Sequence, residues 1–456
     1  MSEPKLHSSR QAALAVLNKC DIRDAAMVTI VDKLISRTDR KQQASDIVFG
    51  VIRNHSALDM IITKFGQLGG RKVSDKLFNI LRIGAYELIY SPQTAEYAIV
   101  NEAAQLASNF GGKKQVGFIN AVLRQIARSI EKRIAPIDPD KLQKTLPQTP
   151  ASGCVFKEDI FPEAAGSDVE YLSRAFSLPG WVVDDWVDRF GFADAEKICF
   201  ASNRRPGIFL RANRLKISPQ RLHEKLQAAG YDVQLLANSM IKIKSPGSIR
   251  NIDGFAEGLF SVQDPTAAGA VKALNLKSGL RVLDLCSAPG GKATQMAELM
   301  DDNGEIIATD IDSQRLKKVA PSCKRLGISI VKTIQYENIA RQEPFDVILL
   351  DVPCSNTGVL ARRPQVRHRI TPQAINHLAD TQLEILNSAV KFLKDGGRMC
   401  YSTCSICQQE NSELLARFIA KNDDFVIESE KLTLPSTGRR QGYEHDGGFS
   451  AIINRK

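Results

Sequence analysis

The stretch that most constrains the fold of this 456-residue chain is RVLDLCSAPGGKATQMAELM, residues 281–300. A short apolar run opens it and predicts a buried β-strand, and helix-forming residues with apolar positions three to four apart follow from Ala293. Between the two, Pro289, Gly290 and Gly291 allow a sharp turn that a ligand can approach closely. N–H groups at the following helix start favour an anionic group. The same glycines also fit a βα turn without a ligand, and their spacing is not GxGxxG.

Three further strands are predicted after this turn, each ending near a polar or sulfur-bearing residue. EIIATDID carries Asp310, FDVILLDVPC ends with Asp351 and Cys354, and GGRMCYSTCS carries Cys404. Continuous apolar runs of this kind are typical of parallel strands covered on both faces. Because ligands bind at the carboxyl ends of parallel strands, we expect these four residues and Cys286 to meet in one crevice.

The composition indicates a globular protein with a polyanionic partner. Hydrophobic residues make up 43% of the chain, and the net charge is +10, which favours a nucleic acid. No apolar run approaches the roughly twenty residues of a membrane span, and the first residues lack a signal-peptide core. We therefore expect a cytoplasmic protein without membrane contact. Its nine cysteines show no paired framework, so free thiols are expected.

The chain divides into four predicted regions. Helical periodicity marks a bundle over 1–132, and a proline-rich, aperiodic linker is expected over 133–166. A small α/β module is predicted over 167–255, ahead of a catalytic sheet domain over 256–456. Basic residues of the bundle could form a face for RNA: Arg10, Arg53, Lys113, Lys114, Arg124 and Arg128.

The two crevice cysteines are compatible with a metal pair, a redox pair or a nucleophile. A zinc site would draw on Cys400, Cys404 and Cys407, but Cys400 lies inside a predicted strand and no histidine is near in sequence. Only Cys404 and Cys407 have CxxC spacing, which is a poor match to a redox unit. We therefore predict no metal site.

Three motifs resemble the cofactor and cysteine motifs of the Sun/RsmB group of RNA (cytosine-5) methyltransferases: DLCSAPGGK, DVPCSNTGVLARRP and YSTCSICQQENSE, followed by a final HDGGFSAIINRK. The helical front resembles the NusB RNA-binding domain in FGVIRNHSALDMIITKF, LRIGAYELIY, AIVNEAAQLA and GFINAVLRQIAR. The resemblance implies a NusB-like helical bundle, a small α/β module and a C-terminal Rossmann-like methyltransferase domain. It also implies S-adenosyl-L-methionine as cofactor and 16S ribosomal RNA as substrate.

By the same resemblance, Cys404 is the nucleophile that adds to carbon 6 of cytosine, and Cys354 assists release. Asp351 would hold the cytosine edge and also border the cofactor. Glu337 is assigned to the adenine side, with Asn338 as the alternative, since the usual aspartate is absent. The remaining predicted cofactor contacts are Cys286, Ser287, Ala288, Pro289, Gly290, Gly291, Lys292 and Asp310. A basic run beside the Cys354 motif is expected to bind phosphates: Arg362, Arg363, Arg367, His368 and Arg369.

Two alternatives stay open. One is a cytosine-5 methyltransferase of another nucleic acid, transfer RNA or DNA, and a DNA-type enzyme would make Cys354 the nucleophile. The other is a non-catalytic RNA-binding assembly factor that has kept a cofactor-binding shell. The presence of both cysteines, both aspartates and the glycine turn argues against it. We expect a monomer that acts on free RNA or on an assembly intermediate.

Overall fold

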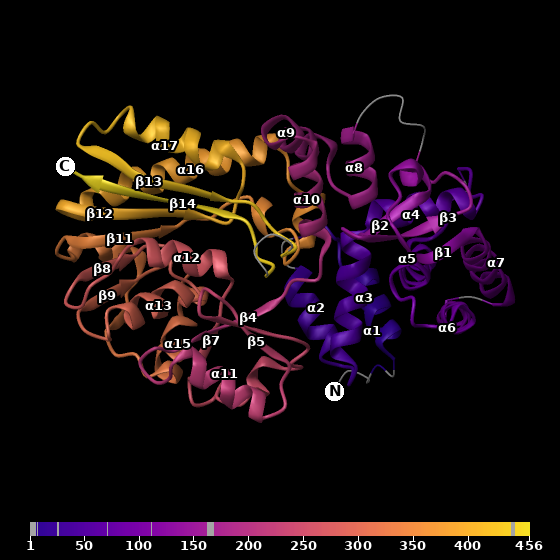
Figure 1. Cartoon of the computed structure of the whole chain (residues 1–456), viewed down its shortest axis with the longest axis horizontal. Helices are drawn as coiled ribbons and strands as arrows, with labels where there is room; N and C mark the ends of the chain where they lie inside the picture. Colours follow the sequence, from indigo (N-terminus) through magenta and orange to yellow (C-terminus); the bar gives the residue numbers. More distant parts are fainter. Residues whose placement is uncertain are drawn as a thin grey trace. The chain divides into compact units, whose positions relative to one another are not determined.

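The computed structural model of the chain contains two compact units, residues 1–204 with 363–369 and residues 205–362 with 370–456 (Figure 1). It describes residues 6, 8–24, 27–70, 72–110, 112–161, 168–438 and 443–456. Within these ranges no helix is long and apolar enough to cross a bilayer.

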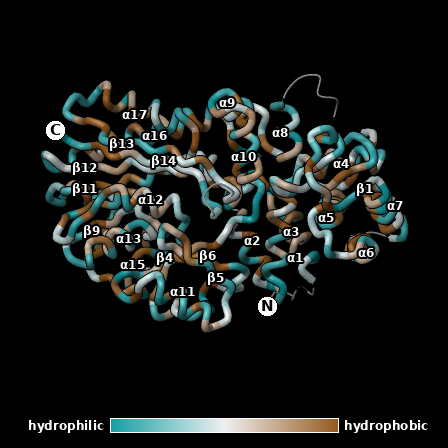
Figure 2. Tube along the Cα trace, in the orientation of Figure 1, coloured by the Kyte–Doolittle hydropathy of each residue, from teal (hydrophilic) through white to brown (hydrophobic). Residues whose placement is uncertain are grey.

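The first unit is built around a bundle of amphipathic helices. Its central helix α5 contacts α1, α3, α4, α6 and α7 and buries apolar residues on several faces, as the predicted helical periodicity requires. Hydrophobic and hydrophilic stretches alternate along these helices in Figure 2. The seven helices are α1 (Ser9–Lys19), α2 (Met27–Ile35), α3 (Lys41–Arg53), α4 (His55–Phe65), α5 (Asp75–Tyr90), α6 (Glu96–Ser108) and α7 (Lys113–Ser129).

A three-stranded antiparallel sheet occupies most of the region predicted to be a linker. Its order is β1-β3-β2, and Phe156 of β3 stacks on Phe65 of α4 with ring centroids 5.6 Å apart. Arg133 of β1 donates to several carbonyl oxygens near the end of α5, among them Leu88 O at 2.7 Å. The expectation of an irregular linker is therefore wrong over 133–156, while 162–167 lie outside the described residues. The elements are β1 (Ile130–Pro136), η1 (Pro139–Lys144), β2 (Thr145–Thr149) and β3 (Ser152–Phe156).

The predicted small module is divided between the two units. Its first part is helical and belongs to the first unit, as α8 (Asp168–Phe176), α9 (Gly180–Phe190) and α10 (Phe192–Asn203). Trp186 of α9 is completely buried, which agrees with a packing role. The predicted boundary at 166/167 therefore does not separate the compact units, which meet in the chain at Arg204 and Arg205.

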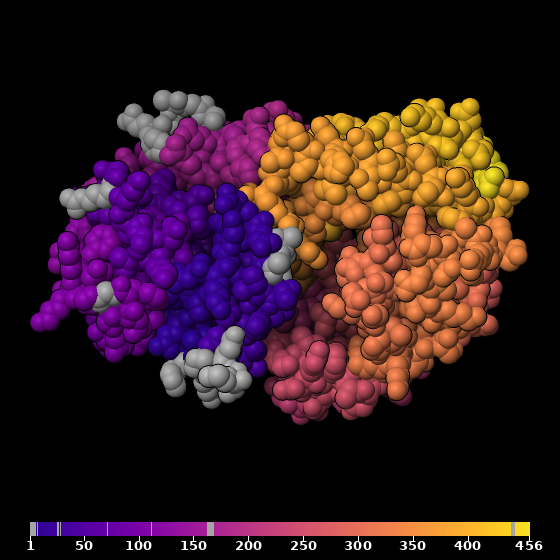
Figure 3. Space-filling model, turned by 180° about the vertical axis from the view of Figure 1, so that it is seen from behind, coloured from indigo at the N-terminus to yellow at the C-terminus, as the bar shows by residue number. Residues whose placement is uncertain are grey.

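The second part of the module is a four-stranded antiparallel sheet with order β5-β6-β4-β7, and α11 packs Leu222 and Leu226 against it. Arg211 of β4 forms a buried ion pair with Glu298 at 2.6 Å, which ties the module to the catalytic sheet. The space-filling view shows the pink atoms of this sheet module against the orange atoms of the catalytic part of the same unit (Figure 3). The elements are β4 (Ile208–Ala212), α11 (Pro219–Ala228), β5 (Val233–Leu235), β6 (Met240–Ile243), η2 (Ile249–Asn251) and β7 (Phe260–Val262).

The catalytic part is a seven-stranded sheet with order β10-β9-β8-β11-β12-β14-β13. Neighbours from β10 to β12 are parallel, and β14 alone runs in the opposite direction. The strands are β8 (Arg281–Asp284), β9 (Glu305–Ala308), β10 (Val331–Thr333), β11 (Phe345–Asp351), β12 (Leu393–Thr403), β13 (Phe425–Thr433) and β14 (Gly448–Arg455).

Both faces of this sheet are covered by helices (Figure 1). Alternate strand residues enter separate cores, with Ile348 and Leu350 of β11 against α16 and α17 and Val347 and Leu349 against α12, α13 and α15. This arrangement explains the continuous apolar strands. The helices are α12 (Pro265–Ala273), α13 (Gly291–Leu299), α14 (Ser313–Leu316), α15 (Val319–Leu326), α16 (Pro372–Ala389) and α17 (Ser412–Ile419).

The strand order reverses direction between β8 and β11. From β8 the chain proceeds outward through β9 and β10, and it then returns to place β11 and β12 on the other side of β8. In open α/β sheets the ligand crevice lies at such a point, beyond the carboxyl ends of the strands.

Candidate active site

The glycine turn after β8 has the backbone conformation that its sequence predicts. Gly290 has φ of 98°, a left-handed conformation that costs glycine little and other residues more. A Cβ at this position would lie 3.1 Å from Val319. The Gly290 N–H donates to Ser287 O at 2.7 Å, and α13 begins at Gly291. The turn therefore brings backbone close to the crevice and opens a helix N-terminus beside it.

Asp310, just after β9, binds the same turn. Its Oδ2 accepts from Ala288 N at 3.1 Å and its Oδ1 from Asp312 N at 2.9 Å. Arg315 donates to Ala288 O at 2.8 Å. Each carboxylate oxygen retains a further lone pair for a ligand hydroxyl, so Asp310 both organises the turn and borders the crevice.

Asp284, the last residue of β8, is a site residue that was not expected from the sequence motifs. It is completely buried, and neither of its carboxylate oxygens, nor the Ser287 hydroxyl, has a hydrogen-bond partner of ordinary geometry among the described residues. Burial raises the pKa of Asp284 to about 7, with Asp351 and Asp310 acting in the same direction and Ser287 and Lys292 opposing it. Unsatisfied buried acceptors beside a glycine turn fit a ligand that carries an amino group. The sequence does hold a signal for this residue, because Asp284 is an acid at the end of a predicted buried strand, directly before the glycine turn.

An ion pair between Lys292 and Asp351 joins the two sides of the point where the strand order reverses. Lys292 lies at the start of α13, after β8, and Asp351 is the last residue of β11. Lys292 Nζ lies 2.5 Å from Asp351 Oδ2. Burial would lower the pKa of Lys292, but the negative charges of Asp351, Cys404 and Asp284 outweigh it and raise that pKa above its ordinary value. The ammonium therefore stays charged and acts electrostatically on the Cys404 sulfur. From the sequence, Lys292 is expected only in the cofactor cradle.

Cys354 and Cys404 lie together, as their positions after β11 and β12 predict. Their sulfur atoms are 3.0 Å apart, and both residues are half-buried free cysteines. Cys404 Sγ also donates to Asn356 Oδ1 at 3.2 Å. The hydrogen bond with Cys404, followed by burial, raises the pKa of Cys354 well above its ordinary value, so Cys354 is held as a neutral thiol. No group of three or more His, Cys, Asp or Glu side chains within the described ranges is arranged to hold a metal ion.

Two further predicted cofactor contacts occupy different environments. Cys286 is half-buried, and burial together with Asp284, Asp351 and Asp310 raises the pKa of its thiol. A thiol of this kind is a poor nucleophile. Glu337 is exposed in the 3-10 helix η3 (Tyr336–Arg341) that follows β10, at the same edge of the sheet.

The basic run after Cys354 is only partly available for phosphate. Arg362 pairs with Asp446 and with Asp264, the latter at 3.0 Å. Arg367 is buried within the first unit, where its guanidinium donates to Ser202 O at 2.9 Å and to other acceptors. The expectation that both bind phosphate is therefore corrected, because their donors already have protein partners. Arg363 and Arg369 remain exposed.

The sheet order, the glycine turn after its first strand and the acid after its second define the class of the catalytic part, a Rossmann-like methyltransferase. Family models match in three places: the NusB family at residues 7–128, an RsmF/B-like ferredoxin-like domain at 178–250 and 16S rRNA methyltransferase RsmB/F at 271–445. The chain belongs to this RsmB/F family of methyltransferases. It is an S-adenosylmethionine-dependent RNA methyltransferase.

Relatives cover nearly the whole chain. The chain is 30% identical to the probable ribosomal RNA small subunit methyltransferase B of Bacillus subtilis over 432 residues, which is 92% of this chain and 90% of that protein. The corresponding protein of Synechocystis is also 30% identical over 443 residues, covering 94% and 92%.

Solved structures share the fold. The crystal structure of PH0851 has a TM-score of 0.74 at 22% identity and covers 100% of both chains. A methyltransferase homolog protein from Pyrococcus horikoshii has a TM-score of 0.55 at 26% identity, covering 64% of this chain and 100% of that one.

Proposed function

We propose that the chain methylates carbon 5 of a cytosine in 16S ribosomal RNA through a covalent bond between Cys404 and carbon 6. The observation that carries the proposal is the pair of cysteine sulfurs 3.0 Å apart, with the Lys292–Asp351 ion pair beside Cys404. The names of the relatives, small subunit methyltransferase B, support this substrate.

The cofactor cradle is proposed to consist of the glycine turn and the acids around it. The backbone of Ser287 to Gly291 and the buried Asp284 carboxylate would receive the amino-acid end, and Asp310 would receive ribose hydroxyls. Lys292 and Asp351 close the cradle toward Cys404, and Glu337 is retained as the candidate on the adenine side. Bound S-adenosylmethionine supplies the electrophilic methyl group.

Cys404 would act first. Carbon 5 of cytosine is a weak nucleophile, and addition of the Cys404 thiolate to carbon 6 turns carbon 5 into an enamine-like nucleophile. The Lys292 ammonium is close enough to Cys404 to interact electrostatically with its sulfur. Asp351, with a partly exposed carboxylate, can accept a hydrogen bond from the amino group of the base as charge develops. The target base must be unstacked to reach these groups.

Cys354 would act last. Once carbon 5 carries the methyl group, its proton passes to solvent, the bond between carbon 6 and sulfur breaks, and Cys404 leaves as a thiolate. Cys354 is a neutral thiol 3.0 Å from that sulfur, so it can donate its proton to the leaving thiolate. The arrangement gives the two cysteines different steps.

We also propose that the chain acts as a monomer, in the cytoplasm, on free 16S RNA or an assembly intermediate. The proposed domain limits are 1–204 for RNA recognition, 205–262 for the small module and 263–456 for catalysis, with 363–369 packed in the first unit.

The test is methylation by the purified full chain with labelled S-adenosylmethionine and unmodified 16S RNA, with 23S RNA and transfer RNA as comparison substrates. We expect label in 16S RNA alone, at one cytosine that bisulfite sequencing then detects as 5-methylcytosine. Label in transfer RNA instead would favour the alternative substrate, and the absence of label in every RNA would favour a non-catalytic assembly factor.

A further inference from the structure

A buried polar network joins the loop that carries Cys354 to the loop that carries Cys404. We call it the cysteine clamp. It consists of Ser355 and Thr357 on the first loop, Ser405 and Glu410 on the second, and Gln382 of α16. All five side chains are buried, and none belongs to the predicted catalytic or cofactor set.

Glu410 is the centre of the cysteine clamp. Its Oε1 accepts from Ser355 N at 2.7 Å and from Gln382 Nε2 at 3.0 Å, while its Oε2 accepts from the Ser355 hydroxyl. A buried carboxylate needs this number of donors to offset the loss of water. Glu410 thus holds both the backbone and the side chain of the residue next to Cys354.

The serine and threonine hydroxyls complete the connection. Ser405, the residue next to Cys404, lies 3.0 Å from the hydroxyl of Ser355 and 3.0 Å from that of Thr357. The single proton of the Ser355 hydroxyl lies within hydrogen-bond reach of two acceptors, Glu410 Oε2 and Ser405 Oγ. Gln382 also donates to Pro353 O at 2.8 Å, so both sides of Cys354 are fixed.

We propose that Glu410 is a positioning residue that sets the distance between the Cys354 and Cys404 sulfurs, and so the rate of product release. The inference rests on the proposed two-cysteine function. Each cysteine is followed by a residue of the cysteine clamp, Ser355 after Cys354 and Ser405 after Cys404. The two loops consist of 3-10 turns and bends, so no hydrogen bonds of a β-ladder hold them in place. Without the carboxylate, Ser355 N–H and its hydroxyl lose their acceptor and the Cys354 loop is free to move away from Cys404.

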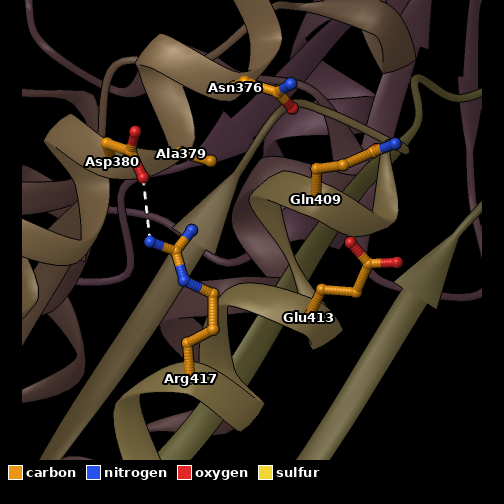
Figure 4. Close-up of a pocket in the computed structure, with 6 residues that line it drawn as sticks. All are labelled: Asn376, Ala379, Asp380, Gln409, Glu413 and Arg417. Carbon is orange, nitrogen blue, oxygen red and sulfur yellow. Dashed lines mark hydrogen bonds and ion pairs between the residues drawn. The ribbon is translucent and has the colours of Figure 1, made fainter.

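A surface cavity over α16 and α17 supplies a matched control. The cavity has a volume of about 200 Å³, and Figure 4 shows Glu413 on its wall near Gln409, while Arg417 pairs with Asp380 at 2.8 Å. Glu413 is exposed and lies three residues after Glu410. Removing its carboxylate changes the charge equally without touching the cysteine clamp.

The first experiment compares Glu410→Ala, Glu410→Gln, Glu413→Ala and wild type on 16S RNA. Misplacement of reacting groups by about 1 Å can cost about a hundredfold in rate, so Glu410→Ala should lower kcat on that scale with an unchanged KM for S-adenosylmethionine. It should also accumulate protein bonded to RNA on denaturing gels. Glu410→Gln, whose amide oxygen can still accept from Ser355 N–H, should recover part of kcat. Glu413→Ala should match wild type.

The second experiment needs no RNA. Diamide, a two-electron azo oxidant that is reduced to its hydrazine, removes two electrons and two protons from a thiol pair and leaves a disulfide. The rate at which the Cys354–Cys404 disulfide forms, measured by peptide mass spectrometry, should fall in Glu410→Ala and not in Glu413→Ala. Ser355→Ala, which removes only one hydroxyl, should give a smaller decrease in the same direction and serves if Glu410→Ala does not fold.

Equal disulfide rates in wild type, Glu410→Ala and Ser355→Ala would overturn the positioning role. So would a Glu410→Ala variant that methylates and releases RNA like wild type, or a Glu410→Gln variant no faster than Glu410→Ala. A third outcome separates the two proposals. If Glu410→Ala forms the disulfide more slowly but the wild type does not methylate 16S RNA, the proposed substrate is overturned and the positioning role of Glu410 stands.

Discussion

Cys404 and Cys354 are adjacent in space but should respond differently to substitution, because they act at opposite ends of the reaction. Cys404→Ala removes the nucleophile, so it should abolish methylation and form no covalent complex. Cys354→Ala removes the proton donor for the leaving sulfur, so it should methylate once and remain bonded to the RNA. Denaturing gels with labelled 16S RNA distinguish the two, because the bonded complex migrates slowly.

Cys407→Ala is the matched control for this pair, since Cys407 is a buried thiol close in sequence to Cys404 and has no proposed step. It should turn over without a slow band. A slow band from Cys404→Ala and none from Cys354→Ala would exchange the roles and favour the DNA-type arrangement.

Asp284 should make stability depend on pH. Its folded pKa of about 7, raised from 3.8 by burial, means that the folded state holds a proton that the unfolded state releases above about pH 4. Its contribution to the free energy of unfolding is therefore complete below about pH 4 and is lost as the pH rises through 7. Asp284→Asn stays neutral. The free energy of unfolding of Asp284→Asn, relative to that of the wild type, should therefore rise by up to about 4 kcal/mol between pH 4 and pH 8.

Chemical denaturation of the ligand-free protein at a series of pH values measures this difference. Asp346→Asn is a control with the opposite sign, because hydrogen bonds and ion pairs with Lys394 and Arg281 outweigh burial and lower the pKa of Asp346. Parallel pH profiles for wild type and Asp284→Asn would contradict the buried, unsatisfied state of this carboxylate.

At the scale of elements, exposed basic residues of α7 are the best candidates for an RNA surface. Lys114, Arg124 and Arg128 are exposed and lie on one side of the helix at spacings of ten and four residues. Arg10 and Arg53 are less available, because Arg10 pairs with Glu87 at 2.6 Å and Arg53 is buried.

Reversing these three charges to glutamate should weaken binding of 16S RNA and reduce the salt dependence of the dissociation constant, because phosphate contacts are lost. Reversal of Arg40, Lys41 and Lys132, which are also exposed in the same unit, changes the net charge equally and should have a smaller effect. Filter binding at several salt concentrations measures both. Equal losses in the two variants would show that only net charge matters.

Elements were predictable where local pattern and packing agree. The strands β8, β9, β11 and β12 contain apolar runs, which predict that both faces of each strand are buried. The β1–β3 sheet escaped prediction because its strands contain Pro136 and Pro147 and lack alternation, so only contacts such as Phe156 on Phe65 reveal it. The convergence of Cys354, Cys404 and Asp351 followed from strand polarity alone. The partners of Arg362 and Arg367 are distant in sequence, which no local motif could show.

At the scale of the whole molecule, the chain passes three times between its compact units, at 204/205, 362/363 and 369/370. The segment 363–369 follows the Cys354 loop but packs in the first unit, where Arg367 and His368 contact carbonyl oxygens of Arg53 and Ile52. A deletion of 1–132 would remove these acceptors together with any RNA surface. Charge reversal on α7 is therefore a cleaner test of RNA recognition than truncation.

The central claim is that one 16S cytosine receives its methyl group through Cys404. Bisulfite sequencing of total RNA from a deletion strain, complemented with wild type or with Cys404→Ala, tests it most directly. We predict that a single 16S cytosine loses protection on deletion, regains it with wild type and stays unprotected with Cys404→Ala. Full protection of every 16S cytosine in the deletion strain, or restoration by Cys404→Ala, would contradict the claim.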